Sequence, residues 1–390
     1  MKMRIGVLSP FYQNYNYGGK LQALAMIRVL EQQGYAAKQI CYRQPSLRGR
    51  NGPSDRIVRL VHSSDYRRAV LQKLLAKCLP GTDENLEQRR GAFDRYDSFI
   101  PHTDRVYSDR DIVETTADFD VFLSGSDQVW NPNLFKRAYF LDFVPDGKYK
   151  MSYAASIAGT LNEEWQSYFR QQLAGFDAIS VREKQGRQIL EEIFPGREIA
   201  CSLDPTLLLG ADEWGKAASK PIVDEPYMFC YFLGYSAAQR SLARSVARVK
   251  GLTLITLPHL LGTAGRCYPC DISFGDRRLY DVQPDQFIAL IQHADCILTD
   301  SFHATVLSLL FQKPFVAFDR TGATDHGSRV GELLEMCRMQ THYCGKAATV
   351  RSVCDLLEKQ DVLRRDILDQ HRDESMRYLI NNLKKAEGML

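Results

Sequence analysis

Short apolar runs alternate with helical patterns from the first residues of the chain onward. Arg4 to Ser9 form an apolar run that ends in turn residues, and Leu21 to Leu30 then repeat apolar positions with a helical period up to Gly34. Ala36 to Tyr42 supply a second apolar run, so the chain opens as strand, helix, strand, which is the unit of a parallel sheet. Further short strands are expected at Asp120–Leu123, Met151–Ala155 and Ala178–Val181.

The same alternation continues in the second half of the chain. The run Ile199 to Leu209 ends a first domain, and the polar residues 210–225 predict a connection to a second one. The pattern predicts strands at Tyr227–Leu233, Thr253–Leu257, Cys296–Thr299 and Phe315–Phe318, and helices at Ala237–Lys250, Pro284–Gln292 and Phe302–Phe311. We therefore expect an α/β protein with two Rossmann-like parallel-sheet domains.

A chain of 390 residues is long enough to bury two separate hydrophobic cores. We expect an N-terminal domain over 1–209 that carries a helical insertion at about 45–116, and a C-terminal domain over 226–360. A last helix within 361–390 should pack back across both domains. The insertion is rich in Arg and Lys, which favours a solvated helical hairpin over a patch for anionic lipid or for a diphosphate-linked acceptor.

Charge and cysteine content exclude some functions. The formal net charge of +3 is too small to indicate a nucleic-acid partner. The N-terminus shows no signal peptide, and apolar stretches end well short of the roughly 20 residues that span a membrane, so we expect a cytoplasmic protein with at most peripheral contact at the inner face of the cell membrane. The 10 cysteines are scattered, and the closest pair, Cys267 and Cys270, lacks the second pair that a zinc site needs, so no metal is predicted.

Ligands of open parallel sheets bind beyond the carboxyl ends of the strands, and two loops of the first domain stand there. The first loop carries Asn16, Tyr17, Gly18 and Gly19, and its glycines either let backbone amides approach an anion or merely make a tight turn. The second loop carries Ser126 and Asp127, followed by Trp130. These side chains could hold sugar hydroxyls and stack on a sugar ring, or they could form a turn with an Asp cap and a core Trp.

Two further places follow buried strands. Arg182 leaves the strand at 178–181, and its planar guanidinium matches a carboxylate or phosphate, although a structural pair with Glu183 or Asp204 is the alternative. In the second domain, Asp300 or Ser301 caps a helix and places His303 in its first turn, near amides that favour an anionic oxygen. His303 is thus a candidate general acid.

Taken together, these segments resemble the polysaccharide pyruvyl transferase family. The resemblance rests on an ordered series: NYNYGGKLQALAM, DVFLSGSDQVWNP, YFLDFVP, MSYAASIAG, ISVRE, CSLDPTLLL, DCILTDSFHATVLSLLFQKPFVAF and GSRVGELL. It implies a fold similar to GT-B glycosyltransferases, with two domains that face each other across a cleft. It also implies that Arg182 and His303 are the catalytic, donor-binding pair. Ser301 stands where some relatives have a basic residue, and Arg329 is a candidate replacement cation for the donor phosphate or carboxylate.

The resemblance further implies the reaction. The enzyme would move the enolpyruvyl group of phosphoenolpyruvate onto two hydroxyls of a sugar, in a polysaccharide or a lipid-linked glycan precursor, to form a pyruvate ketal and release phosphate. Phosphoenolpyruvate is a donor substrate, and no cofactor is expected. Two alternatives stay open: a GT-B-type sugar-nucleotide glycosyltransferase or epimerase, and a non-catalytic carbohydrate-binding protein that keeps the fold.

Overall fold

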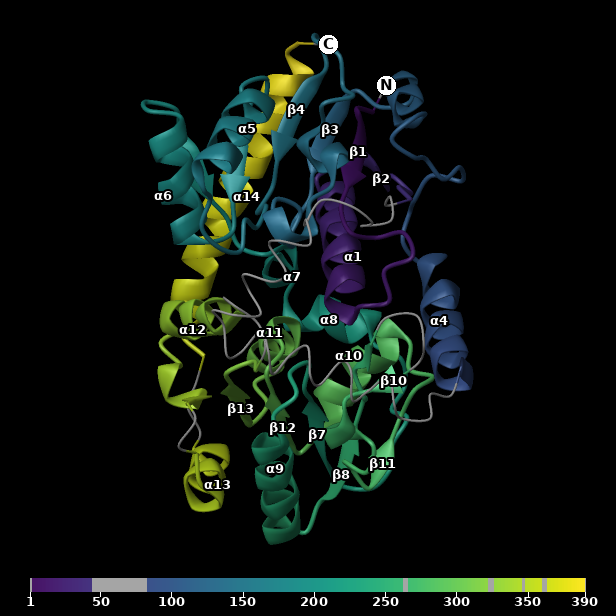
Figure 1. Ribbon diagram of the computed structural model, residues 1–390, viewed down its shortest axis with the longest axis vertical. Coiled ribbons are helices and arrows are strands. Elements are labelled where there is room, and N and C mark those ends of the chain that lie inside the picture. The colour runs from purple at the N-terminus through teal and green to yellow at the C-terminus, as the bar shows by residue number, and fades with distance from the viewer. Residues whose placement is uncertain are drawn as a thin grey trace. The chain divides into compact units, whose positions relative to one another are not determined.

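The computed structural model describes residues 2–43, 83–261, 266–321, 326–345, 348–359 and 363–389. These residues fall into two compact units, each of which is built on parallel strands (Figure 1). The described residues of the first unit are 2–43, 97–210 and 366–389, and those of the second lie within 83–96 and 211–365.

The described residues of the first unit form six strands that all run parallel. The order is β2-β1-β3-β4, a parallel pair β5-β6 follows, and bridges from Met151 to Ala178 and from Ala155 to Val181 join β5 to β4. The order reverses between β1 and β3, so the loops after these two strands lie at the topological switch point, where ligands of such sheets bind. The strands are β1 (Arg4–Leu8), β2 (Ala36–Gln39), β3 (Val121–Ser124), β4 (Tyr149–Ser152), β5 (Ile179–Val181) and β6 (Ile199–Cys201).

The helices of the first unit include the C-terminal one. They are α1 (Tyr17–Gln32), α5 (Glu163–Leu173), α6 (Lys184–Ile193), α7 (Pro205–Leu208) and α14 (Arg365–Glu387), with 3-10 turns at Ile112–Ala117, Pro132–Leu134 and Arg137–Phe140. The hydroxyl of Tyr378 on α14 donates to the Ser152 carbonyl at 2.9 Å, and Arg372 Nε donates to the Leu207 carbonyl at 2.6 Å. The last helix, which we expected to pack across both domains, thus has these contacts with the first unit.

The second unit has a six-stranded parallel sheet in the order β11-β8-β7-β12-β13-β14. The order reverses between β7 and β12, so the loops after these strands form a second switch point. The strands are β7 (Tyr227–Tyr231), β8 (Thr253–Thr256), β11 (Arg277–Arg278), β12 (Cys296–Thr299), β13 (Phe315–Phe318) and β14 (Tyr343–Cys344); a small antiparallel pair joins β9 (Leu260–Leu261) to β10 (Arg266–Cys267).

The helices of the second unit alternate with its strands. They are α8 (Ala211–Ala217), α9 (Ala237–Lys250), α10 (Pro284–His293), α11 (Phe302–Leu310), α12 (His326–Met336) and α13 (Val350–Glu358), with 3-10 turns at Pro269–Asp271 and Gln340–His342. Ser236 caps the start of α9, and Gly251, at φ 64°, ends it in the left-handed conformation that glycine adopts without strain. The expected α/β class with two parallel-sheet domains is confirmed.

The helical insertion that we expected at about 45–116 is described only in part. Residues 45–82 lie outside the described part of the chain, so the choice between a solvated hairpin and an anion-binding patch stays open. The described part, α4 (Asp83–Asp97), groups with the second unit as far as Tyr96. Two contacts account for this: Arg89 Nε donates to the Tyr280 carbonyl at 2.9 Å, and Arg95 pairs with Asp281 at 2.7 Å.

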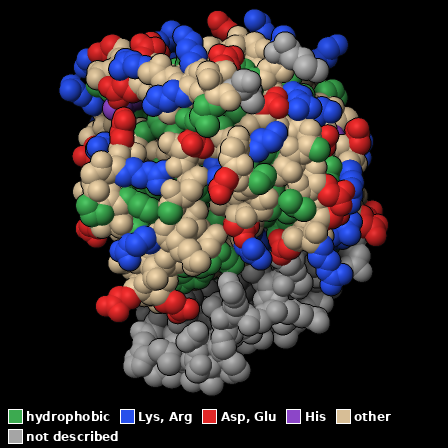
Figure 2. Space-filling model, turned by 90° about the horizontal axis from the view of Figure 1, so that it is seen from above, with side chains coloured by type: hydrophobic (Ala, Val, Ile, Leu, Met, Phe, Trp, Pro, Cys, Tyr) green, Lys and Arg blue, Asp and Glu red, His purple; other side chains and the backbone are tan. Residues whose placement is uncertain are grey.

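The surface bears charges of both signs. On the face seen in Figure 2, Lys and Arg side chains are interspersed with Asp and Glu, in keeping with the small net charge of +3. Among the helices that the structure describes, none is long and apolar enough to cross a membrane.

Candidate functional site

Gly18 and Gly19, which we expected on a loop, belong to the first turn of α1 (Tyr17–Gln32). The Asn16 side chain caps α1 by accepting from the Gly18 amide at 2.9 Å, so that amide already has an acceptor. A Cβ on Gly19 would run into the Asn14 side chain and would stand 3.1 Å from the Pro10 carbonyl oxygen. These contacts cap and pack the start of α1, and an acceptor or anion role for Asn16, Tyr17, Gly18 and Gly19 stays a prediction.

Two residues at the start of α1 face the protein interior. Tyr17 is 1% exposed, and Lys20 is buried, donates to the Phe11 carbonyl at 2.9 Å and pairs with Asp97. The Lys20 ammonium also lies 4.4 Å from the centre of the Phe11 ring. The charge of Lys20 is therefore neutralised inside the first unit.

The loop after β3 also turns most of its side chains inward. Ser126 is buried and donates to Asp204 Oδ2 at 3.0 Å. Trp130 is 1% exposed, its indole nitrogen donates to the Tyr139 carbonyl at 3.2 Å, and its ring stacks on Phe140 with 5.9 Å between centroids. Trp130 is thus the core Trp of the alternative interpretation and not a platform for a sugar ring.

Asp127 differs from its neighbours on this loop. Its φ is 71°, in the left-handed region that Asp tolerates better than most residues but at a cost in backbone energy. The Asp127 carbonyl accepts from Val129 at 2.8 Å and from Ser156 at 2.9 Å, which fixes this backbone conformation. Its side chain is 24% exposed, and one carboxylate oxygen lies 3.9 Å from Nη2 of Arg182.

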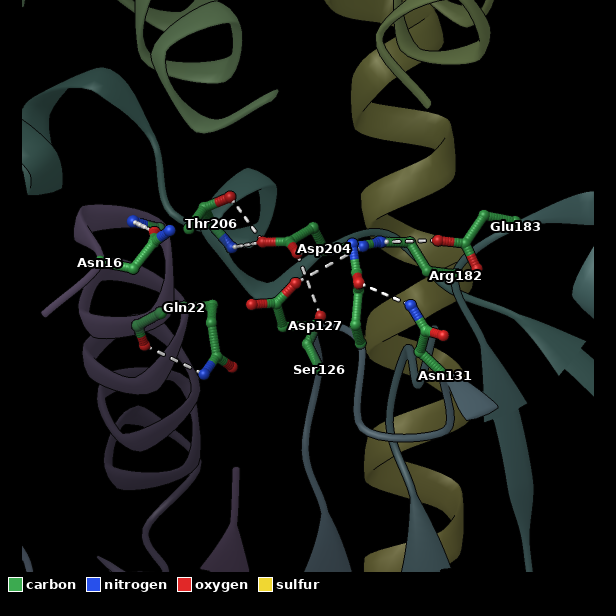
Figure 3. Close-up of polar contacts among 12 residues, drawn as sticks. Asn16, Gln22, Ser126, Asp127, Asn131, Arg182, Glu183, Asp204 and Thr206 are labelled. Carbon is green, nitrogen blue, oxygen red and sulfur yellow. Dashed lines mark hydrogen bonds and ion pairs between the residues drawn. The ribbon is translucent and has the colours of Figure 1, made fainter. Parts of the chain in front are cut away.

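Arg182 lies at the centre of a buried ionic network in the first unit (Figure 3). Its side chain is 5% exposed, Nη1 donates to Asp204 Oδ2 at 2.7 Å, and Nε donates to Glu183 Oε1 at 3.1 Å. Burial alone lowers the pKa of Arg182, but the negative charges of Glu183, Asp204 and Asp127 outweigh burial and raise that pKa above its usual value. These are the partners of the alternative interpretation, a structural pair with Glu183 or Asp204.

Asp204 connects this network to the start of α7. Its Oδ1 accepts from the Thr206 amide at 3.0 Å and from the Thr206 hydroxyl at 2.6 Å, and Pro205 holds the first helical position. From the sequence alone, Asp204 is expected only as an alternative partner of Arg182. The Asp-Pro-Thr order was the signal that marked it as a helix cap.

In the second unit, Asp300 and Ser301 make different contacts at the start of α11. The Ser301 hydroxyl caps the helix by accepting from the Ala304 amide at 3.4 Å. The buried Asp300 carboxylate accepts instead from the amides of Leu233 at 2.6 Å and Gly234 at 2.8 Å, and so ties the loop after β7 to the loop after β12. Burial raises the pKa of Asp300, while Arg320 and the two amides oppose that rise.

His303 and Arg329 both belong to the second unit. His303 is the second residue of α11, is half-buried, and meets the Phe302 ring edge to face at 5.2 Å. Arg329 lies half-buried in the first turn of α12, a helix that packs against α11. Arg182 and Asp127 belong to the first unit. The catalytic and donor-binding roles expected for Arg182, His303, Ser301 and Arg329 stay predictions.

The pair Cys267 and Cys270 bears no sign of a reactive thiolate. Burial raises the pKa of Cys270 to about 11 and also raises the pKa of Cys267. Within the described ranges, no group of three or more His, Cys, Asp and Glu side chains could hold a metal ion.

Solved structures show which fold the chain shares. UDP-N-acetylglucosamine 2-epimerase from Rickettsia bellii is similar at 11% identity with a TM-score of 0.55, over 100% of this chain and 98% of that chain. The corresponding epimerase from Methanocaldococcus jannaschii is similar at 11% identity with a TM-score of 0.54, over 98% of this chain and 99% of that chain. The epimerase from Neisseria meningitidis is similar at 12% identity with a TM-score of 0.51, over 98% of this chain and 100% of that chain. At such identities the likeness shows the fold alone, and it confirms the expected GT-B-like class.

Sequence comparison shows the family. No curated protein matches the chain. The model of the family described as polysaccharide pyruvyl transferase matches residues 16–322, which is most of the chain and includes the start of α1, Arg182 and the start of α11. The chain therefore belongs to the polysaccharide pyruvyl transferase family.

Proposed function

We propose that the protein transfers the enolpyruvyl group of phosphoenolpyruvate to two hydroxyls of one sugar in a polysaccharide or in a lipid-linked glycan precursor, with release of phosphate. The observation that supports this reaction best is the family match over residues 16–322. The position of His303 in the first turn of α11 adds to it, because a helix start favours a bound anion and an imidazole titrates near neutral pH.

The chemistry needs one proton donor and a stable phosphate leaving group. His303 protonates the methylene carbon, which becomes the methyl group and leaves an oxocarbenium-like carbon. One sugar hydroxyl attacks that carbon, the carbon–oxygen bond to phosphate breaks, and a second hydroxyl closes the ketal. The two hydroxyls lose two protons, of which one replaces the proton placed on the methyl group and the other is carried away on inorganic phosphate.

The donor-binding groups that we propose lie at the starts of two neighbouring helices. Ser301 caps α11, and Arg329 stands in the first turn of α12. Negative charge grows on phosphate as it leaves, and a fixed guanidinium with the amides of a helix start stabilises that charge without reorganising. Arg329 thus supplies the cation that Ser301, a neutral residue, does not. This chemistry calls for no metal or cofactor.

The test is a reaction with the full-length protein. Phosphoenolpyruvate is incubated with a panel of free and lipid-linked glycans, and phosphate release and product mass are followed together. We expect a product that has gained one pyruvate and lost one water, formed with one phosphate. Transfer from a uridine diphosphate sugar, or its epimerisation, without any reaction of phosphoenolpyruvate, would contradict the proposal and favour the sugar-nucleotide alternative.

A further inference from the structure

We propose that Arg320 binds the carboxylate of phosphoenolpyruvate, so that the two anionic ends of the donor are each met by a separate guanidinium of the second unit. The inference rests on the proposed function, because it concerns the donor of the same reaction. In that function Arg329 and the start of α11 meet the phosphate, and Arg320 adds a partner for the other end of the molecule.

Arg320 follows β13 at the edge of the sheet where α11 begins. β13 lies beside β12 in parallel, with Thr299 opposite Ala317, so the loops after both strands leave the sheet at the same edge (Figure 1). Arg320 is two residues past the end of β13, and Ser301 is two residues past the end of β12. The register thus places Arg320 beside the loop that leads to His303.

Three loops of the second unit meet at Gly234. A Cβ on Gly234 would stand 2.8 Å from the Thr321 amide nitrogen and 2.9 Å from Asp300 Oδ2. Gly234 belongs to the loop after β7, Asp300 to the loop after β12, and Thr321 to the loop after β13. Arg320 is therefore one residue from this meeting point, and so is Ser301, the cap of α11.

Contacts of the two neighbouring residues fix the backbone at Arg320. Asp319 accepts a hydrogen bond from the hydroxyl of Tyr343 on β14. The Thr321 hydroxyl accepts from the Tyr235 amide at 2.9 Å. The segment that carries Arg320 is thus held on one side by β14 and on the other side by the loop after β7.

The guanidinium of Arg320 keeps its hydrogen-bond donors. The side chain is half-buried, and in the part of the chain that the structure describes no carboxylate, hydroxyl or carbonyl accepts from it. Burial raises the pKa of Asp300 and of Tyr268, and the positive charge of Arg320 opposes both rises, so the guanidinium lies near both groups. The planar fork of an arginine matches the two oxygens of a carboxylate.

The buried carboxylates at this edge have other partners. Asp300 accepts from two backbone amides of the loop after β7, and Asp271 pairs with the buried Arg240 at 2.9 Å. Arg182 of the first unit shows the opposite arrangement to Arg320, because its guanidinium bonds two carboxylates of the protein at 2.7 and 3.1 Å. An arginine that is anchored through its backbone and not bonded through its side chain is suited to bind an anionic ligand.

The alternative is that Arg320 acts only as a counter-charge to the buried Asp300. A counter-charge needs no planar fork, so lysine would serve equally well. Its removal would also act through the fold and would weaken different ligands alike. A carboxylate-binding role instead makes the effect of Arg320 depend on whether the ligand has a carboxylate.

Two ligands separate these roles when they are titrated against the full-length protein and followed by phosphorus NMR. Phosphoenolpyruvate carries a phosphate and a carboxylate, whereas ethyl phosphate lacks the carboxylate. We expect the unmodified protein to bind phosphoenolpyruvate at least about tenfold more tightly than ethyl phosphate. Arg320→Ala should weaken phosphoenolpyruvate by about 10- to 100-fold and change the dissociation constant of ethyl phosphate by less than about twofold. Arg320→Lys should weaken phosphoenolpyruvate by about threefold or more, because the fork is lost.

Two further variants make the comparison specific. Arg329→Ala should weaken both ligands together, because its proposed partner is the phosphate that they share. Arg351→Ala, at an exposed arginine of α13 in the same unit, is the matched control and should leave both dissociation constants unchanged.

Each remaining outcome decides the question. Equal weakening of the two ligands by Arg320→Ala, unchanged binding of both, or full binding of phosphoenolpyruvate by Arg320→Lys would overturn the inference. Unfolding of both Arg320 variants would overturn it as well, because the guanidinium would then hold the fold.

Failure of the proposed function is seen separately, in the unmodified protein. Absence of phosphoenolpyruvate binding there would reject the proposed function together with this inference. The expected binding pattern without phosphate release from any glycan would reject the proposed reaction and support the carboxylate site at Arg320.

Discussion

The loops that follow the parallel strands bury a carboxylate in both units but stabilise it in different ways. In the first unit, Asp204 faces the guanidinium of Arg182 at 2.7 Å, and Glu183 and Asp127 share the same cation. In the second unit, Asp300 accepts from two backbone amides, those of Leu233 and Gly234. A charged side chain after a buried strand is therefore not by itself a sign of contact with substrate, because its hydrogen bonds can all be made to other groups of the protein.

The two units also differ in the side chains that are only partly buried at these loops. In the first unit Asp127 is the least buried of the three carboxylates around Arg182, with a side chain that is 24% exposed. In the second unit the start of α11 carries His303, which is half-buried. The following predictions test the differences between the two units, beginning with the largest expected effect.

Replacing His303 should cause the largest loss of turnover. We expect His303→Ala to lower turnover by about 10² to 10⁴-fold, because the substitution removes the general acid that we propose, while the melting temperature changes little. Phosphate release measures the effect, and His293→Ala, at an exposed histidine at the end of α10, is the control. Near-normal phosphate release from His303→Ala would rule out the role.

Removing the buried carboxylate of the first unit should strongly destabilise the protein. Asp204→Ala leaves the guanidinium of Arg182 without its shortest partner and removes the cap of α7, and we expect a loss of about 3 to 5 kcal/mol in the free energy of unfolding. Denaturant unfolding followed by fluorescence would measure it. A loss below about 1 kcal/mol would show that the network does not hold the first unit together.

The corresponding change in the second unit should cost less. Asp300→Asn keeps an oxygen that accepts from one of the two amides of Leu233 and Gly234, and we expect a loss of about 1 to 3 kcal/mol. Denaturant unfolding would again measure the loss in the free energy of unfolding. A loss equal to that of Asp204→Ala would contradict the difference that we describe between the two units.

A glycine in the first turn of α1 should give a smaller loss of stability. Gly19→Ala should destabilise the protein by about 1 to 3 kcal/mol, because the new methyl group meets the Asn14 side chain and stands near the Pro10 carbonyl. Gly331→Ala on α12 is the matched control: its methyl group meets open space within a helix, so we expect a gain of about 0.5 to 1 kcal/mol. Equal thermal shifts would contradict the packing role of Gly19.

An ion pair on the surface should matter least. Arg4 forms an ion pair with Asp120 at 2.9 Å, and its hydrogen bond lowers the pKa of the Asp120 carboxyl. The ion pair therefore stabilises the folded protein fully at a pH above the usual Asp pKa, and this stabilisation is lost as the pH falls through the lowered pKa of Asp120. Because the Arg4 side chain is 45% exposed, Asp120→Asn should cost about 1 kcal/mol or less at neutral pH. Unfolding at pH 7 and in acid would show the difference between the two proteins shrinking as pH falls; a difference that grows would contradict this account.

The sequence predicted the second unit in most detail. The helix expected at Ala237–Lys250 and the strands expected at Cys296–Thr299 and Phe315–Phe318 have those same bounds in the structure. The reason is local: apolar runs identify buried parallel strands, and Ser236 and Gly251 mark the two ends of the helix.

What the sequence could not provide depends on contacts between distant residues. Asp204 is 22 residues from Arg182 and 78 from Ser126, and no periodicity indicates that the three side chains meet. The grouping of α4 with the second unit is a similar case, because it rests on contacts of Arg89 and Arg95 with residues 191 and 186 positions away. The burial of Trp130 likewise follows from packing against Phe140, Phe169 and Phe176, which only the folded chain brings together.

The most direct test of the central claim is a reaction run in heavy water, with phosphoenolpyruvate and a glycan that the panel identifies as an acceptor. Mass spectrometry and NMR of the product would show what has been transferred. Protonation of the methylene carbon predicts a pyruvate ketal whose methyl group carries one deuterium from the solvent, formed together with one inorganic phosphate. A phosphorylated sugar with free pyruvate, or a ketal without solvent deuterium in its methyl group, would contradict the account.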